Sequence, residues 1–592
     1  MSSPTKLIRR LGVFIALLGL IVVLLGLRLV DFQVVRAAEI QQESLKARSV
    51  LNTLTALRGQ IVDSQGQVLA RTVFRYDVNV APKNVGPVFK TVDGVKIELS
   101  VEQITRELSA ILGLSFEEIA PKLIGDSEYA NIAKKVNADV YNQIRDLGIP
   151  WVYTDTFSDR LYPDGAVAGN VIGFVGADGT PLAGLELQYN PCLAGVDGQE
   201  AFERSPDGVR IPSSTVTTQP TEDGGTLKLT IDSNLQFFAQ QVMADTVNDT
   251  GAKWASAIVI EAKTGRILAA AEAPSVDPND PAGVEAADRG SRIFQTAFEP
   301  GSIMKSLTAA MVVDTGTANE FDTRPAPDYM KLDFADGSIK DSFNHEDYTL
   351  TLAGVLRYSS NTGISNFGIE IPSATRYKYL EKFGFGTESE IHFEGESSGI
   401  LHPYKTWDKM TNYATMFGQG ISVTTIQMAS AYQAIANGGV RLDPVLVDSC
   451  TKSDGSVVQV APQSSTRVVQ ESTADLTLEL MEKVVEFGGV GKTAQIPGYR
   501  VGGKTGTAQL QEGTGYGSQY AISFYGVAPI EDPEFIVGIS IYKPIGASNS
   551  AGTTAPFKAI MQQVLKTYRV PPSTTNSRNI PSNKYGLADA PN

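Results

Sequence analysis

The stretch FEPGSIMKSLTAA, residues 298–310, decides how this chain of 592 residues is interpreted. Its Pro-Gly pair interrupts the chain just before a helical run, Ile303 to Val313, so Ser302 stands at a helix start. Lys305 lies one turn later on the same face. A serine is a weak nucleophile until a base takes its proton, and a lysine whose pKa is lowered by burial or by a second cation could be that base. Taken alone, the spacing also fits a serine that merely caps the helix and a lysine exposed to solvent.

Two later segments carry related residues. LRYSSNTGISNFG places Ser359 and Asn361 two residues apart, which puts both on one side of an extended segment or both in a tight loop. RVGGKTGTAQ places Lys504 in an extended segment lined by glycines, and glycines within a strand often mark the close approach of a ligand. Lys504 is therefore the second cation that we expect near Lys305.

Each of these motifs has a duplicate, at Ser3 to Lys6, Ser577 to Asn579 and Lys263 to Gly265. The Lys263 copy lies between two apolar strands, which predicts a hairpin turn with a solvated lysine. Because any single match is uninformative, the weight falls on the order Ser-x-x-Lys, Ser-x-Asn, Lys-Thr-Gly. That order is the pattern of serine acyl-transferases such as penicillin-binding proteins and β-lactamases.

The N-terminal sequence predicts a membrane anchor. Leu11 to Leu27 is uncharged, and seventeen residues at about 1.5 Å each nearly cross the hydrocarbon of a bilayer, with Arg28 able to snorkel. Basic residues before this run predict a cytoplasmic N-terminus, so everything after about Phe32 lies outside the cytoplasm. A cleaved signal peptide is the alternative, since VVRAAE near residues 37–38 suits a cleavage site.

Composition excludes several other classes. The net charge of −15 argues against a nucleic-acid surface, which needs clustered basic residues. Cys192 and Cys450 lack CxxC spacing, so we expect no zinc site, and whether they form a disulfide is left open. FGGVGKT has Glu486 where a phosphate loop needs its first glycine. No metal or other cofactor is predicted, and the histidines are scattered, at His345, His392 and His402.

Beyond the apolar stretch the chain divides into two folded regions. From Arg58, β-runs, helical spacing and Gly-broken strands predict a mixed, elongated module. A polar run rich in Pro and Gly suggests a boundary near residue 225, and the pattern from there to about Arg569 is α+β. The last residues are polar and Pro-rich. The predicted segments are a cytoplasmic tail at 1–10, an anchor at 11–31, folded regions at 32–225 and 226–570, and a disordered tail at 571–592.

Over roughly Arg58 to Thr567 the chain resembles the class B penicillin-binding proteins, the membrane-anchored peptidoglycan transpeptidases. Stretches beyond the three motifs share the resemblance, among them RGQIVDSQGQVLA, GLELQYN, GESSGILHP and MFGQGISVTTIQMASAYQAIANGG. It implies an α+β chain with an N-terminal transmembrane helix and an elongated pedestal domain at 32–225. A transpeptidase domain at 226–570 would follow, with a five-stranded antiparallel sheet sandwiched by helices.

The resemblance also implies a role for each motif. Ser302 would attack the penultimate D-Ala carbonyl of a stem peptide, with Lys305 as its base, and release the terminal D-Ala to leave an acyl-enzyme. β-Lactams, which mimic D-Ala-D-Ala, would acylate the same serine. The N–H groups of Ser302 and Thr507 would form the oxyanion hole. The remaining residues would relay protons, hold the substrate amide and carboxylate, and form the edge strand on which the peptide docks: Ser359, Asn361, Lys504, Thr505, Gly506 and Thr507.

The expected product is a peptidoglycan crosslink, formed when an amine of a neighbouring strand takes the acyl group. The pedestal occupies the room that a glycosyltransferase domain would need, so glycan polymerisation would fall to a multi-spanning membrane partner among other division proteins. The compact pedestal, FEPGSIMK and the chain length favour the septal, cell-division type. The alternatives are an elongation-type enzyme, a β-lactam-binding sensor or scaffold without crosslinking activity, and a hydrolase such as a carboxypeptidase or β-lactamase. The acceptor amine and the oligomeric state are left open.

Overall fold

The computed structural model describes residues 4–37, 39–40, 49–92, 95–203, 214–334, 337–458, 463–512, 515–546 and 551–584. Its contacts divide the chain into two compact units. The first comprises Met1–Leu57 and Gly195–Gly224, and the second comprises Arg58–Ala194 and Gly225–Asn592.

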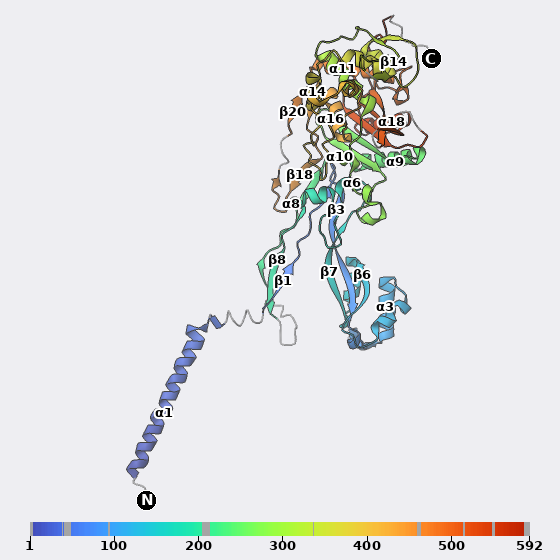
Figure 1. The fold of residues 1–592 in the computed structure, drawn as a ribbon. Coiled ribbons are helices and arrows are strands. Elements are labelled where there is room, and N and C mark those ends of the chain that lie inside the picture. Colours follow the sequence, from blue (N-terminus) through green and yellow to red (C-terminus); the bar gives the residue numbers. More distant parts are fainter. Residues whose placement is uncertain are drawn as a thin grey trace. The chain divides into compact units, whose positions relative to one another are not determined.

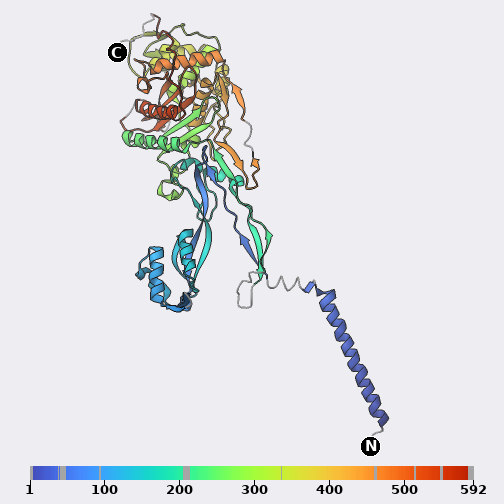
Figure 2. The same cartoon turned by 180° about the vertical axis from the view of Figure 1, so that it is seen from behind.

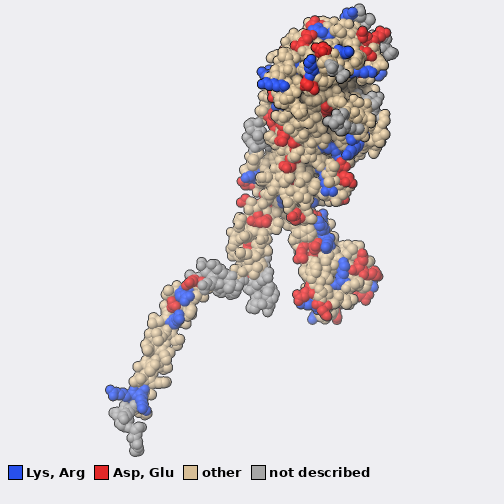
Figure 3. All heavy atoms as spheres, in the orientation of Figure 1, with Lys and Arg blue, Asp and Glu red and all other residues tan. Residues whose placement is uncertain are grey.

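The first unit holds one long apolar helix and a small sheet. Helix α1, Pro4–Val30, continues into a π-helical turn, Asp31–Val35. Its apolar window, Leu7–Val35, has a mean hydropathy of 2.9 and is not buried against any part of the described chain. Figure 3 shows the middle of this helix as an uncharged surface, with basic atoms gathered at its N-terminal end and both basic and acidic atoms at its other end. Such a helix suggests a single-pass membrane anchor. The sheet is antiparallel, with strands β1 (Ser49–Leu54), β8 (Gly198–Glu203) and β9 (Val216–Gln219).

A seven-stranded mixed sheet runs through the second unit. Its order is β19 (Val457–Val458), β18 (Val447–Thr451), β10 (Thr226–Leu229), β2 (Ile61–Val62), β3 (Val68–Val80) and β6 (Ala130–Val136), and β7 (Val152–Leu161) also pairs with β3. Because β10 pairs with β2 in parallel, residues on both sides of the boundary expected near 225 share one sheet. Figure 1 shows β3 and β7 as a long ribbon that leads to a smaller group around α3.

That smaller group has its own core. It contains α3 (Val101–Leu112), α4 (Phe116–Ile119), α5 (Ala138–Asp146) and the hairpin of β4 (Val88–Val92) and β5 (Val95–Leu99). Ile104 and Leu108, on one face of α3, form an apolar cluster with residues of the neighbouring strands. These are Val78 and Val80 at the end of β3 and Trp151 just before β7. Together with the long ribbon, this group forms the mixed, elongated module that the sequence predicted.

A five-stranded antiparallel sheet forms the centre of the second unit. Its order is β12 (Ile267–Ala273), β11 (Trp254–Glu261), β23 (Phe535–Tyr542), β22 (Gly515–Ala528) and β21 (Gly502–Glu512). Successive side chains on β11 point to opposite faces, so Val259 joins one apolar cluster while Ile258 and Ile260 join the other.

Helices cover both faces of this sheet. On the Val259 face lie α9 (Ser233–Thr250) and α18 (Ala551–Thr567), which Figure 2 shows side by side. On the opposite face lie α11 (Met304–Asp314), α16 (Thr425–Ala436) and α17 (Glu471–Val485). The predicted α+β fold, with a five-stranded antiparallel sheet sandwiched by helices, is confirmed.

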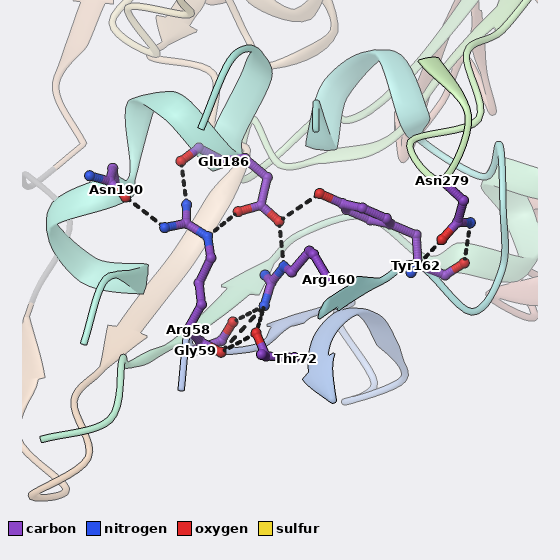
Figure 4. Close-up of polar contacts among 8 residues, drawn as sticks. All are labelled: Arg58, Gly59, Thr72, Arg160, Tyr162, Glu186, Asn190 and Asn279. Atoms are coloured by element: carbon purple, nitrogen blue, oxygen red, sulfur yellow. Dashed lines mark hydrogen bonds and ion pairs between the residues drawn. The ribbon is translucent and has the colours of Figure 1, made fainter. Parts of the chain in front are cut away.

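A buried ion-pair network ties together segments of the second unit that are far apart in sequence (Figure 4). The Glu186 side chain is fully buried, and its carboxylate accepts from Arg58 Nε at 2.6 Å and from Arg160 Nε at 2.8 Å. The Tyr162 hydroxyl donates to the same carboxylate at 3.2 Å. Asn279, which lies beyond β12, donates to the Tyr162 carbonyl oxygen at 2.9 Å. The network therefore links the start of the unit, the end of β7 and the central sheet domain.

The two cysteines, whose pairing the sequence left open, form a disulfide. Cys192 lies in α8 (Asn190–Leu193) and Cys450 in β18, with their Cα atoms 6.3 Å apart. The bridge closes a loop of 258 residues. We expect the double variant Cys192→Ser, Cys450→Ser to be less stable by about 2–5 kcal/mol, because the unfolded chain regains the entropy that the crosslink removes. Urea unfolding of the full chain in detergent measures this, and a midpoint equal to that of the wild type would contradict it.

The prediction of a disordered tail at 571–592 is wrong for the residues that the structure describes. Residues 571–584 lie along the second unit, Ile580 is 4% exposed and Ser582 is 2% exposed. Their main-chain groups bond to the folded domain, for example from Ser573 N to Gly498 O at 2.9 Å. A polar, Pro-rich composition did not indicate that the domain supplies these partners. The rest of that predicted tail, 585–592, lies outside the described residues.

Candidate active site

Ser302 lies where a tight turn enters a buried helix. Gly301–Ile303 forms a 3₁₀ turn that leads into α11. Gly301 has a φ of +57°, and a Cβ there would lie 2.9 Å from the Thr507 carbonyl oxygen of β21. Glycine is therefore required both for the backbone conformation and for the close approach of β21. The Gly301 N–H donates to the Gly418 carbonyl at 2.9 Å, which fixes the turn from its other side.

Ser359 lies in a strained turn between two helices. Helix α12, Leu352–Tyr358, is followed by Ser359, whose φ of +60° is left-handed and unfavourable for a residue with a Cβ. Helix α13, Asn361–Gly368, starts two residues later. The Asn361 side chain donates from Nδ2 to the Lys340 carbonyl at 2.8 Å. A residue held in such a conformation by its surroundings is typical of a functional site.

Asp341, which no sequence motif singled out, fixes this turn. Its side chain is 1% exposed, and Oδ1 accepts from the N–H groups of Asn361 at 2.6 Å and Thr362 at 3.0 Å. Nε2 of His345 lies 3.1 Å from Oδ2, and Nδ1 of the same ring lies 2.6 Å from the Glu346 carbonyl oxygen. Both ring nitrogens thus lie beside oxygen atoms, which holds the imidazole against Asp341. Nothing in the spacing of Asp341, twenty residues before Asn361, could have identified it.

The three predicted motifs meet at the Ser359 side chain. Lys305 Nζ, from α11, donates to the Ser359 carbonyl at 2.5 Å and lies 3.3 Å from its Oγ. Lys504 Nζ, from β21, lies 2.9 Å from the same Oγ. Lys504 also contacts the carbonyl and the hydroxyl of Thr505, each at 3.2 Å. Two amines from different elements therefore share one hydroxyl, an arrangement suited to moving a proton between them.

Burial controls the charge of both lysines. Lys305 and Lys504 are 0% exposed. Desolvation lowers the pKa of Lys305 to about 7, although the Asp341 carboxylate acts in the opposite direction. Desolvation also places the pKa of Lys504 well below its ordinary value, and the nearby Lys305 charge lowers it further. Near neutral pH, a large fraction of Lys305 is therefore an amine that can accept a proton.

The strand that carries Lys504 lies at an edge of its sheet. β21 pairs with β22 and ends the strand order of the five-stranded sheet as described. A Cβ on Gly506 would lie 3.0 Å from the Pro300 carbonyl and would collide with the Ser523 hydroxyl, so this strand passes very close to the Ser302 turn. Thr505 is buried, whereas Thr507 is partly exposed. Of the predicted substrate-binding side chains, Thr507 is thus the more accessible.

The duplicate Lys-Thr-Gly motif lies in a hairpin turn, as the sequence predicted. Lys263 is in the turn between β11 and β12, half exposed and paired with Asp532 at 2.6 Å and Glu534 at 3.4 Å. It is a surface lysine on the hairpin.

Family comparisons agree with the fold and the motifs. A family model described as the penicillin binding protein transpeptidase domain matches residues 255–562. A second, described as the penicillin-binding protein dimerisation domain, matches residues 53–229.

Relatives match along most of the chain. The chain is 32% identical over 580 residues to penicillin-binding protein PbpB of Mycolicibacterium smegmatis. That alignment covers 93% of this chain and 89% of the relative. It is 29% identical over 529 residues to peptidoglycan D,D-transpeptidase FtsI of Escherichia coli, in an alignment that covers 88% of this chain and 86% of the relative.

Solved structures share the fold. A peptidoglycan synthetase from Bifidobacterium adolescentis gives a TM-score of 0.71 at 29% identity, covering 90% of this chain and 100% of that one. Penicillin binding protein 3 from Mycobacterium tuberculosis, complexed with aztreonam, gives a TM-score of 0.68 at 27% identity, covering 88% of this chain and 98% of that one. The chain therefore belongs to the class B penicillin-binding proteins of the septal type, with their transpeptidase and dimerisation domains.

Proposed function

We propose that this D,D-transpeptidase crosslinks peptidoglycan stem peptides through an acyl-enzyme on Ser302. Lys305, as a neutral amine, takes the Ser302 hydroxyl proton while Oγ attacks the carbonyl carbon of the penultimate D-Ala. The carbon–nitrogen bond to the terminal D-Ala then breaks, and the leaving nitrogen receives the proton. An amine of a second strand attacks the ester, and Ser302 recovers its proton as the crosslink forms.

The convergence of Lys305 and Lys504 on the Ser359 hydroxyl is the observation that carries this proposal. Because both amines are buried, the proton taken from Ser302 can travel through Ser359 to the leaving nitrogen without entering bulk water. Asn361, held by Asp341 and Lys340, is suited to bind the substrate amide. Thr507 and the edge of β21 would receive the substrate carboxylate and backbone. The N–H groups of Ser302 and Thr507 would stabilise the oxyanion.

Intact-mass measurement with a β-lactam tests the nucleophile. The wild-type chain is expected to gain the mass of one β-lactam, whereas Ser302→Ala gains none. Ser3→Ala, which removes the serine of the duplicate Ser-x-x-Lys motif, serves as the matched control and should be acylated normally. An adduct that persists in Ser302→Ala would show that another residue is the nucleophile.

Product analysis separates crosslinking from trapping or hydrolysis. With a D-Ala-D-Ala stem peptide and an amine acceptor, a transpeptidase forms the crosslinked product and releases D-Ala. A sensor or scaffold releases no D-Ala, and a carboxypeptidase releases D-Ala without crosslinking. Either of the last two outcomes, with the partner proteins present, would contradict the proposed reaction.

Acylation should depend on pH in a defined direction. Below a pH of about 7, Lys305 carries its proton and cannot accept another, so the acylation rate constant is expected to rise through about pH 7 and then level off. Asp341→Asn removes the carboxylate that raises the pKa of Lys305, so the midpoint should move to lower pH. Stopped-flow measurement of the acylation rate between about pH 6 and pH 9 gives the midpoints of the wild type and of the Asp341→Asn variant. Asp347→Asn, at an exposed position of the same loop, should leave the midpoint in place. A flat profile for the wild type would exclude Lys305 as the titrating base.

We also propose that the N-terminus is cytoplasmic and the catalytic domain lies outside. Arg9 and Arg10 precede the apolar run, which supports this orientation. The natural partners would then be a multi-spanning glycan polymerase and other division proteins in the membrane. Protease added to spheroplasts should digest the catalytic domain, and full protection would reverse the orientation.

A further inference from the structure

The C-terminal residues 571–584, here termed the strap, contact the chain just ahead of the Lys504 strand. Ser573 N donates to the Gly498 carbonyl at 2.9 Å, and Arg500 N donates to the Ser573 hydroxyl at 2.8 Å. Arg500 also donates from Nη1 to the Thr575 hydroxyl at 2.9 Å. Since β21 begins two residues after Arg500, these bonds fix the point where the Lys504 strand enters the sheet.

The strap then crosses helix α17. The Ser577 hydroxyl lies 3.0 Å from Glu482 Oε2 and accepts from Lys483 Nζ at 2.8 Å. Arg578 donates to Glu479 at 2.8 Å and to Glu320 at 2.6 Å. Helix α17 packs against both β21 and α12, so the strap spans the outside of the helix that lies between these two elements.

The strap ends at the start of α12, the helix that leads into Ser359. Thr351, the N-cap of α12, donates from Oγ1 to the Pro581 carbonyl at 2.6 Å and from N to the Ser582 carbonyl at 3.2 Å. A Cβ on Gly354, one turn into α12, would collide with the same Ser582 carbonyl. Ile580 is buried just before these contacts. Close packing of main chain against main chain therefore fixes the start of α12.

We propose that the strap is a positioning segment for catalysis, which holds the strand that bears Lys504 in register with the helix that leads into Ser359. Helix α12 has only seven residues, so a shift at Thr351 passes to Ser359. The Lys504 Nζ to Ser359 Oγ distance is 2.9 Å, and a displacement of about 1 Å would break that hydrogen bond. Misplacement of that size can lower a catalysed rate by about 10²-fold.

Two truncations of the full chain in detergent test this inference, which rests on Ser302 as the proposed nucleophile. A stop codon at position 571 removes the strap, and a stop codon at position 585 is the matched control that keeps it. We expect the first to slow acylation by a fluorescent penicillin at least about tenfold and to speed hydrogen exchange in residues 352–358. The control should match the wild type in its acylation rate and in its hydrogen exchange at residues 352–358. A synthetic peptide of residues 571–584, added at saturating concentration, should restore much of the rate.

A point variant covers the case in which the first truncation does not fold. Gly354→Ala should displace the end of the strap while leaving α12 itself intact, since alanine favours helix. Gly552→Ala, at a helical glycine whose nearest atoms lie 3.6 Å or more from an added Cβ, is its control. Slower acylation and faster exchange in α12 for Gly354→Ala alone would support the inference.

Two results would overturn the inference. The first is a truncation at 571 that folds and acylates within about twofold of the control. The second is a Gly354→Ala chain with unchanged acylation and α12 exchange. If the control truncation forms no adduct at Ser302, the nucleophile assignment fails first and the inference falls with it.

Discussion

Replacing Lys305 by methionine is expected to slow acylation of Ser302 by about 10²–10⁴-fold, the usual contribution of a positioned general base. Lys305 is fully buried, its amine contacts Ser359, and desolvation lowers its pKa to about 7. Methionine keeps the length and apolar stem of the side chain but cannot accept a proton. Stopped-flow measurement of the acylation rate constant gives the effect, and mass analysis confirms that any residual adduct is on Ser302.

Two further variants separate loss of the base from loss of packing. Lys305→Arg keeps a cation but has no neutral form at accessible pH, so it should be as slow as the methionine variant. Lys6→Met alters the duplicate Ser-x-x-Lys motif and should acylate at the wild-type rate. The methionine variant should unfold no more readily than the wild type, because it no longer buries an ionisable amine. If Lys305→Met acylates within a few fold of the wild type, Lys504 becomes the candidate base.

The sequence could predict which motifs lie together because the order of these local motifs is informative. Ser302 was expected at a helix start, and it occupies the 3₁₀ turn before α11. Lys504 was expected near Lys305, and in the structure both amines lie at the Ser359 hydroxyl, where the Lys305 charge lowers the pKa of Lys504. Helical and strand periodicity likewise favoured an α+β domain, because its strands are long and apolar.

Long-range contacts were harder to predict. Asp341 acts through hydrogen bonds to main-chain groups twenty residues away, which leave no pattern in one sequence. The pairing of Cys192 with Cys450 depends on a helix, α8, and a strand, β18, that only the fold brings together. The strap was taken for a disordered tail because composition measures what a segment can bury by itself. Its order depends on acceptors in α17 and on room beside Gly354, which the rest of the domain provides.

The network around Glu186 should dominate the stability of the second unit (Figure 4). Glu186→Gln is expected to lower the free energy of unfolding by about 3–5 kcal/mol, because it leaves two guanidinium groups buried without their carboxylate. The side chains of Arg160 and Arg58 are only 4% and 12% exposed. Urea unfolding of the full chain, followed by circular dichroism, measures the loss. The Ser302 acylation rate of the folded protein should change little, since within the described part of the chain the hydrogen bonds of these three residues include none to the proposed site residues.

Two comparisons show whether burial is the cause. Glu102→Gln removes an ion pair of similar length, 2.8 Å to Arg106, whose side chains are 65% and 67% exposed, and it should have no measurable effect. Replacing Arg58, Arg160 and Glu186 together by apolar residues of similar volume should cost less than Glu186→Gln alone, because no charge is then left unpaired. If the triple variant is less stable than Glu186→Gln, the attraction among the charges of the network outweighs the free-energy cost of burying them. If Glu186→Gln unfolds at the wild-type midpoint, the buried guanidinium groups have found other acceptors.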